Sequence, residues 1–194
     1  MVEQTSDMFV GCLKRRIAAV NTLWQRAVSD MTLDQVNHHE RAGVLPIAFS
    51  LSHFMKSQDF SISGAFLQER PLWVQGEWAR KVGVNIDALG REETVEEMEQ
   101  IRFTDFDAWK AYQAEVVRRI DRVLETLNEA LLAEVVMPAL PANMQNIFCG
   151  LVIPKGGPVR KLEVLECFVY QHGLRHMGEI EHARALVGLK GMTS

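Results

Sequence analysis

The stretch "VRKLEVLECFVYQHGLRHMGEIEHARALVG", residues 159–188, indicates the fold class of this chain. Apolar residues recur in it at spacings of three and four, with charged residues between them, which is typical of an amphipathic α-helix. Gly188 or Gly191 ends the pattern, since glycine commonly follows the last turn of a helix. Such a helix spans about 40 Å, and its apolar stripe needs partners of similar length.

Three other long stretches show helical periodicity. They are residues 6–31, 46–68 and 106–135. Pro46 suits the first turn of the second helix, where its missing N–H is not needed, and Thr104 or Asp105 can cap the third. No sustained strand alternation is visible. We therefore expect an all-α four-helix bundle, and the length fits a single domain over residues 1–194.

The segments between the long helices carry weaker signals. Residues 70–84 predict a short connector helix with two tryptophans, and Thr94 with Glu97 three residues later predicts a capping box. Residues 138–158 are rich in proline and glycine and predict a long loop. A loop of that length in a compact domain is more often functional than idle.

Composition excludes several classes of function. The net charge is −4 and no basic block is present, so the footprint of a nucleic-acid-binding protein is missing. No apolar run approaches the length of a membrane span, and the first residues do not resemble a secretory signal. The three cysteines are scattered outside any CxxC spacing, which favours free thiols in a reducing cytoplasm. We expect a cytoplasmic protein with no nucleic-acid or membrane partner.

The candidate site begins with His172 and His176. Imidazoles at positions i and i+4 of a helix lie on one face and can bind the same divalent ion. Glu179 lies within about 20° of His172 on that face, at 100° per residue, and is a candidate proton acceptor. The spacing is shared with zinc proteases, but Gly173 stands where their catalytic glutamate would be, which excludes that reading.

His53 is the candidate third ligand. A histidine pair alone is more often a surface or core feature than a ligand set, but His53 sits among leucines and phenylalanines of the second helix. A buried imidazole without a partner is unfavourable, whereas coordination to a metal satisfies it. Three neutral nitrogens with open positions would form a catalytic type of site, equally suited to zinc, nickel or iron.

Other polar residues are expected at the surface. His38 and His39 fall in the loop before the second helix, and His182 points away from the stripe of His172. Asp59 is off the face of His53 and is expected to be a surface acid. The stripe of His172 also contains Leu165, Phe168 and Ala183, which should meet the bundle core.

These stretches resemble the DinB-like proteins. "LPIAFSLSHFMKSQDF" resembles their second helix, "WVQGEWARKVGV" their tryptophan-containing connector, and residues 156–191 their last helix with its HxxxHxG run. The resemblance covers nearly the whole chain in element order. It implies an up-down-down-up bundle, a divalent metal bound by His53, His172 and His176, and a homodimer. Glu179 stands where the family more often has glutamine.

The resemblance also implies a chemistry. Its best-understood members are transferases and isomerases that use a low-molecular-weight thiol, such as mycothiol or bacillithiol. The leading hypothesis is thus a metal-dependent thiol S-transferase or isomerase acting on a small molecule, with the tryptophans of residues 73–78 and loop 138–158 as pocket walls. A metal-dependent hydrolase that activates water is the alternative. A non-enzymatic, stress-related binding module is a third possibility, because bundles host unrelated functions.

Overall fold

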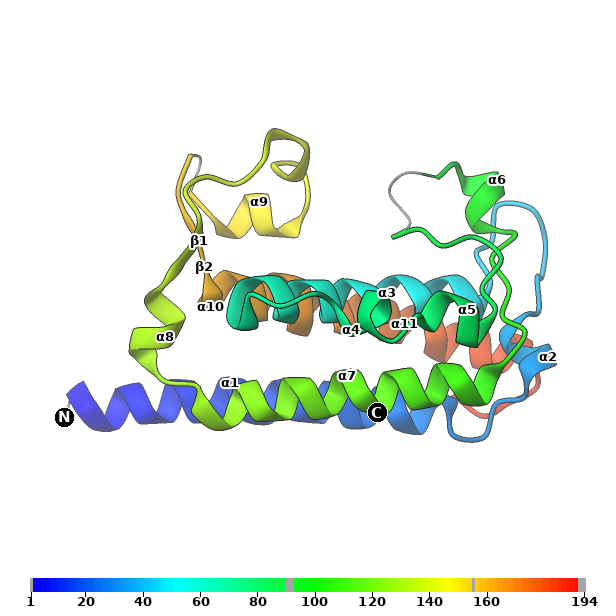
Figure 1. The fold of residues 1–194 in the computed structure, drawn as a ribbon, viewed down its shortest axis with the longest axis horizontal. Coiled ribbons are helices and arrows are strands. Elements are labelled where there is room, and N and C mark those ends of the chain that lie inside the picture. The colour runs from blue at the N-terminus through cyan, green and yellow to red at the C-terminus, as the bar shows by residue number, and fades with distance from the viewer. Residues whose placement is uncertain (1, 90–92, 155, 192–194) are drawn as a thin grey trace.

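The computed structural model describes residues 2–89, 93–154 and 156–191, and within them four long helical rods form an all-α bundle (Figure 1). The first two rods are α1 (Val2–Val28) and α3 (Ile47–Ile62), the latter extended by the π-helical turn η1 (Ser63–Leu67). The third is α7 (Phe106–Thr126). The fourth joins α10 (Lys161–Glu163), the π-helix η3 (Val164–Gln171) and α11 (His172–Leu186).

The rods run up, down, down and up. In Figure 1, α1 and the rod ending in α11 run in one direction, while α3 and α7 run in the other. The long connection that lets α3 and α7 run parallel contains α4 (Leu72–Gln75), α5 (Trp78–Val82) and α6 (Val95–Met98). The expectation of an all-α bundle with a short connector is confirmed, although the connector contains several short helices.

The predicted helix starts are confirmed where a side chain makes the cap. Thr94 and Glu97 form the expected capping box at α6, and Asp105 accepts a hydrogen bond from the Ala108 N–H at 2.8 Å at the start of α7. Thr32 caps the short helix α2 (Leu33–Val36) in the same way. These signals are local, because a capping side chain bonds a backbone group only two or three residues away.

The predicted C-terminal end of the third long helix is wrong. Instead of continuing to residue 135, α7 ends at Thr126, because Leu127 has extended backbone angles and Asn128 caps a separate helix, α8 (Glu129–Ala133). The next residues form β1 (Val135–Met137), which pairs antiparallel with β2 (Val159–Arg160). Strands this short show no alternation that the sequence could reveal. The loop between them also contains short helices, η2 (Ala142–Met144) and α9 (Phe148–Val152).

The fourth rod is helical but not uniformly α-helical. Residues 164–171 form a π-helix, in which each hydrogen bond joins residues i and i+5. The helix face predicted from a rotation of 100° per residue is therefore wrong upstream of His172. Leu165 lies in the main core as expected, whereas Phe168 packs against a second, smaller apolar cluster. That cluster contains Leu140, Cys149, Ile153, Val159, Val164 and Cys167.

The main core fills the space between the four rods. Its largest fully buried side chains include Trp24 of α1, Phe54 of α3, and Trp109 and Tyr112 of α7. No disulfide joins Cys12, Cys149 and Cys167, as expected. Burial raises the pKa of the Cys167 thiol to about 12. None of the described helices is long and apolar enough to cross a membrane.

Candidate metal centre

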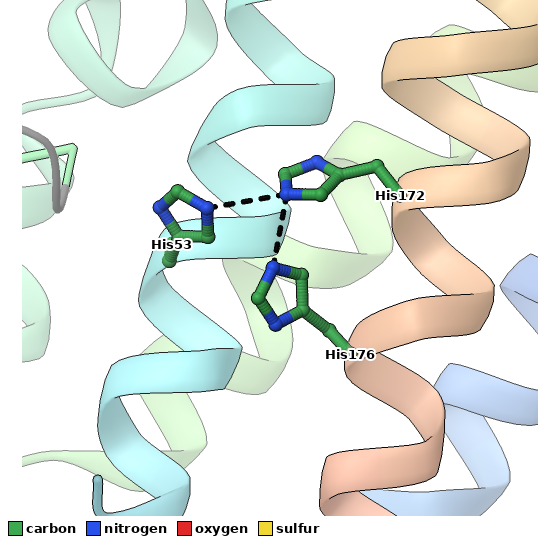
Figure 2. A group of neighbouring side chains, drawn as sticks. All are labelled: His53, His172 and His176. Carbon is green, nitrogen blue, oxygen red and sulfur yellow. Dashed lines mark hydrogen bonds between the residues drawn. The ribbon is translucent and has the colours of Figure 1, made fainter. Parts of the chain in front are cut away.

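The three predicted ligand residues lie together where α3 faces α11 (Figure 2). His53 comes from the middle of α3, and His172 and His176 come from the first two turns of α11. The Nε2 atom of His172 lies 3.2 Å from that of His53 and 2.9 Å from that of His176. One ligand atom from each residue lies within 4.8 Å of the others, so all three can reach one ion.

A close helix contact brings the two sides of the site together. The Cα of Gly173 packs so closely that an added Cβ would lie 2.7 Å from Phe54 Cζ and 2.8 Å from Val20 Cγ1. Its carbonyl accepts a hydrogen bond of 3.2 Å from the indole N–H of Trp24. The sequence showed only that Gly173 replaces the catalytic glutamate of zinc proteases. In the structure, it lets α11 approach α3 at the turn that carries the histidines.

Outer partners set the proton positions of two of the rings. His53 donates from Nδ1 to the backbone carbonyl of Leu89, and His176 donates from Nδ1 to Glu179 Oε2 at 2.6 Å. A carbonyl or carboxylate accepts but cannot donate, so each Nδ1 carries the proton. The Nε2 of each neutral ring then presents a lone pair to the centre, which is the state in which imidazole binds a metal.

His172 completes this arrangement. Its Nδ1 is buried with no hydrogen-bond partner among the described residues. Burial, followed by the proximity of His176 and His53, lowers its pKa to about 3. The ring is therefore neutral at pH 7, and a proton on its Nε2 could bond only one of the two facing lone pairs.

A divalent ion would satisfy all three nitrogens at once. In a tetrahedral zinc site with bonds of about 2.1 Å, ligand nitrogens lie about 3.4 Å apart. The two Nε2–Nε2 separations here, 3.2 and 2.9 Å, are slightly shorter, so a small outward shift of the rings would accommodate an ion. The donor set and its tautomers thus fit a metal bound by three imidazoles, with further positions open.

Glu179 lies on the outer side of His176. Besides its bond to that ring, its Oε2 accepts a hydrogen bond of 3.0 Å from the Ser50 hydroxyl. Burial raises the pKa of Glu179, but the hydrogen bonds from His176 and Ser50 outweigh it and lower the pKa overall. The carboxylate is therefore ionised and orients His176. Its role as a proton acceptor in a reaction stays a prediction.

The remaining histidines lie outside the site. His38 and His182 are exposed, as expected, and His39 is partly buried with its Nε2 3.5 Å from a carboxylate oxygen of Glu99. His38 pairs with Glu40 at 3.0 Å.

The prediction that Asp59 is a surface acid is wrong. The residue is fully buried and accepts hydrogen bonds from the backbone N–H groups of Leu72 (3.0 Å) and Trp73 (2.8 Å) and from the hydroxyl of Tyr112 (3.1 Å). The connector returns over α3 and presents the free N–H groups at the start of α4, which a carboxylate satisfies. Only the tertiary structure brings these groups to Asp59.

The tryptophans of residues 73–78 and loop 138–158, which were expected to line a pocket at the site, lie elsewhere. Trp73 and Trp78 are buried, and their rings pack 4.9 and 5.6 Å from the Tyr112 ring centre, so they belong to the core. Loop 138–158 borders a hollow of about 250 Å³. Its lining residues are Leu140, Gln145, Asn146, Gly150, Ile153, Pro154 and Gly156, and none of the three histidines is among them.

Comparison with known proteins supports the fold alone. A scan against protein-family models and a search of curated proteins give no match. A search of solved structures finds a conserved protein from Enterococcus faecalis with a TM-score of 0.70 and 17% sequence identity, covering 91% of this chain and 95% of that chain. At this identity the similarity supports the bundle fold over nearly the whole chain and gives no information about activity.

Proposed function

We propose that this chain is a DinB-like protein that binds a divalent metal ion through His53, His172 and His176 and acts on a small molecule. The observation that carries the proposal is the convergence of three Nε2 atoms, two of which have their proton held on the far side of the ring by Leu89 and Glu179. Purely structural histidines usually bond to complementary donors or acceptors instead of facing one another with lone pairs.

The proposed reaction is a thiol-dependent S-transfer or isomerisation. A metal held by three neutral imidazoles keeps positions open, at which it would favour the thiolate form of a low-molecular-weight thiol or polarise a carbonyl. Zinc, nickel and iron all suit this donor set. The contribution of the chain is to hold the three nitrogens in place and, through Glu179, to keep His176 in the coordinating tautomer.

Elemental analysis of the purified protein tests the metal site. We expect wild type to retain close to one equivalent of a transition metal after mild chelation, and His53→Ala and His172→Ala to lose it. His182→Ala is the matched control, because it removes an exposed imidazole from the same helix. Equal metal content in wild type and the two ligand variants would contradict the proposal.

A panel of thiols tests the chemistry. The metal-loaded protein is incubated with a bimane-type electrophile and, one at a time, mycothiol, bacillithiol, glutathione and cysteine. Conjugation that requires one of these thiols, and that is lost in His172→Ala, supports S-transfer. Turnover without any thiol would replace this reaction by hydrolysis. Absence of turnover with every thiol would leave a metal-binding module without this activity.

A further inference from the structure

Three polar residues of α3 hold the connector against the bundle. His53, Lys56 and Asp59 follow one another at spacings of three, and each contacts a different part of residues 72–89. Asp59 binds the start of α4, Lys56 binds residues 87 and 88, and His53 binds residue 89. The last of these contacts belongs to the candidate metal centre, whereas the first two lie beside it.

Lys56 is the unusual member of this series. Its side chain is 1% exposed, and burying an ammonium group is costly unless it is paired and hydrogen-bonded. Its Nζ donates to the backbone carbonyl of Ala88, lies 3.4 Å from Asp87 Oδ1, and sits 5.1 Å from the ring centre of Trp73. A carbonyl, a carboxylate and an aromatic face thus surround one charge.

The partners of Lys56 are themselves held in place. The indole N–H of Trp73 donates to the same oxygen of Asp87 at 2.8 Å, and the backbone N–H of Trp73 donates to Asp59 at 2.8 Å. Trp73 is 4% exposed, so it cannot readily change its rotamer. The segment Asp87–Ala88 is therefore anchored to α3 both directly and through Trp73.

The residue that follows this anchored segment is Leu89, whose carbonyl accepts the Nδ1 proton of His53. The carbonyl of Ala88 and the Cα of Leu89 belong to one rigid peptide unit, so holding that carbonyl fixes where the Leu89 Cα lies. From there only the two backbone dihedrals of Leu89 set the direction of its own carbonyl. We propose that Lys56, with Asp87 and Trp73, is a positioning residue that sets the Leu89 carbonyl against His53 and thereby controls the affinity and geometry of the metal centre. This inference rests on the proposed metal site.

The physical consequence concerns the tautomer of His53. With the Leu89 carbonyl in place, the proton stays on Nδ1 and the lone pair of Nε2 faces His172. Without it, the proton can move to Nε2, where it blocks coordination and can bond a neighbouring ring instead. The cost of losing such an outer partner is typically about 10- to 100-fold in metal affinity.

The test compares Lys56→Met with Lys161→Met. Methionine keeps an unbranched apolar stem and removes the charge. Lys161 is a matched control, because it is 8% exposed, pairs with Glu134 at 2.7 Å and lies 5.3 Å from the ring of Phe66, yet it contacts none of the three histidines or Leu89 in the described contacts. Asp87→Asn is a milder second variant at a half-exposed position, which removes only the charge opposite Lys56.

Three readouts separate positioning from a general loss of stability. Zinc affinity is measured by competition with a chromophoric chelator, and the geometry of the centre by the visible spectrum of the cobalt-loaded protein. The tautomer of His53 is measured without metal, from the ¹⁵N resonances of the imidazole. Thermal unfolding of each metal-free variant shows how much stability it has lost.

For Lys56→Met we expect zinc affinity to fall about 10- to 100-fold, the cobalt bands to change, and His53 to populate the Nε2–H form. Asp87→Asn should change the zinc affinity, the cobalt bands and the His53 tautomer in the same direction, but by less. Lys161→Met should leave these three quantities unchanged even if it unfolds at a lower temperature. Wild-type affinity and an unchanged tautomer in Lys56→Met would overturn the inference, as would equal losses in Lys161→Met.

The proposed function fails in a different way. If wild type binds no metal, the proposed function is lost, and the tautomer measurement still decides the inference about Lys56: a shift in Lys56→Met alone keeps it as the residue that orients His53, and no shift overturns it.

Discussion

Gly173→Ala should destabilise the protein although alanine is the better helix former. Gly173 lies within α11, between His172 and the rest of the helix, where α11 packs against α1 and α3. A Cβ at this position would lie 2.7 and 3.1 Å from two ring atoms of Phe54 and 2.8 Å from Val20 Cγ1. Non-bonded carbons prefer separations of about 3.5 to 4.0 Å, so α11 must move outward.

Two opposing effects determine the magnitude. Replacing glycine by alanine inside a helix gains about 1 kcal/mol of unfolding free energy, because it reduces the freedom of the unfolded chain. Inserting a carbon into a packed core costs about 1 to 3 kcal/mol. Phe54 is fully buried and stacks against Trp24 with ring centres 4.5 Å apart, so it has little room to yield. The steric cost should therefore lie in the upper part of its range, about 2 to 3 kcal/mol, which leaves a net loss of about 1 to 2 kcal/mol.

Gly178→Ala is the matched control on the same helix. A Cβ at Gly178 would meet no atom within 4 Å, so only the gain of about 1 kcal/mol applies. Urea unfolding of both variants and wild type, monitored by circular dichroism, gives the three free energies. The difference between the variants isolates the steric contribution, because the propensity change is common to both.

The same movement should reach the candidate site. An outward shift of α11 carries His172 and His176 away from His53, so zinc affinity should fall in Gly173→Ala and remain at the wild-type value in Gly178→Ala. A Gly173→Ala protein as stable as Gly178→Ala would show that the close contact does not constrain α11 and would refute the reasoning.

Three further predictions concern the polar groups. Glu179→Gln should weaken zinc binding about tenfold by loosening His176, and Glu181→Gln on the other side of the helix should not; chelator competition measures both, and equal affinities would count against the role of Glu179. In the metal-free protein, burial holds the pKa of His172 at about 3 against 6.5 unfolded, so the unfolded chain binds the proton first and stability falls as pH drops below 6.5. The loss between pH 7 and pH 4 is about 3 kcal/mol, measurable by urea unfolding, and an equally steep loss in His172→Gln would contradict this cause. Asp59→Asn should cost about 3 kcal/mol by weakening acceptance of buried hydrogen bonds, whereas the exposed Asp121→Asn should be nearly neutral; similar urea midpoints for the two would exclude this role of Asp59.

The sequence predicted the helices well where the signal is local. Helical periodicity and caps such as those of Thr94 and Asp105 depend on residues a few positions apart, so they can be read without the fold. It failed where the outcome depends on distant contacts. The end of α7 at Thr126 and the pairing of β1 with β2 follow from how the chain returns to the bundle.

The candidate site divides in the same way. The spacing of His172 and His176 on one helix indicated a shared ligand, and the apolar surroundings of His53 indicated that it was buried. No pattern in the sequence indicated that Leu89 would accept the proton of His53, because a backbone carbonyl carries no residue signature. Asp59 was likewise predicted to be a surface acid, because no sequence pattern indicates that the connector covers it.

By itself, therefore, the sequence determined an all-α bundle and the identity of three histidines that can share an ion, since helix periodicity is set by neighbours along the chain. Only the tertiary structure decided that their Nε2 atoms converge, which outer groups hold their protons, and why Gly173 must lack a side chain. Apart from the bond between His176 and Glu179, which are three residues apart, these features depend on separations of a few ångströms between residues more than thirty positions apart. Packing, not local preference, fixes such distances.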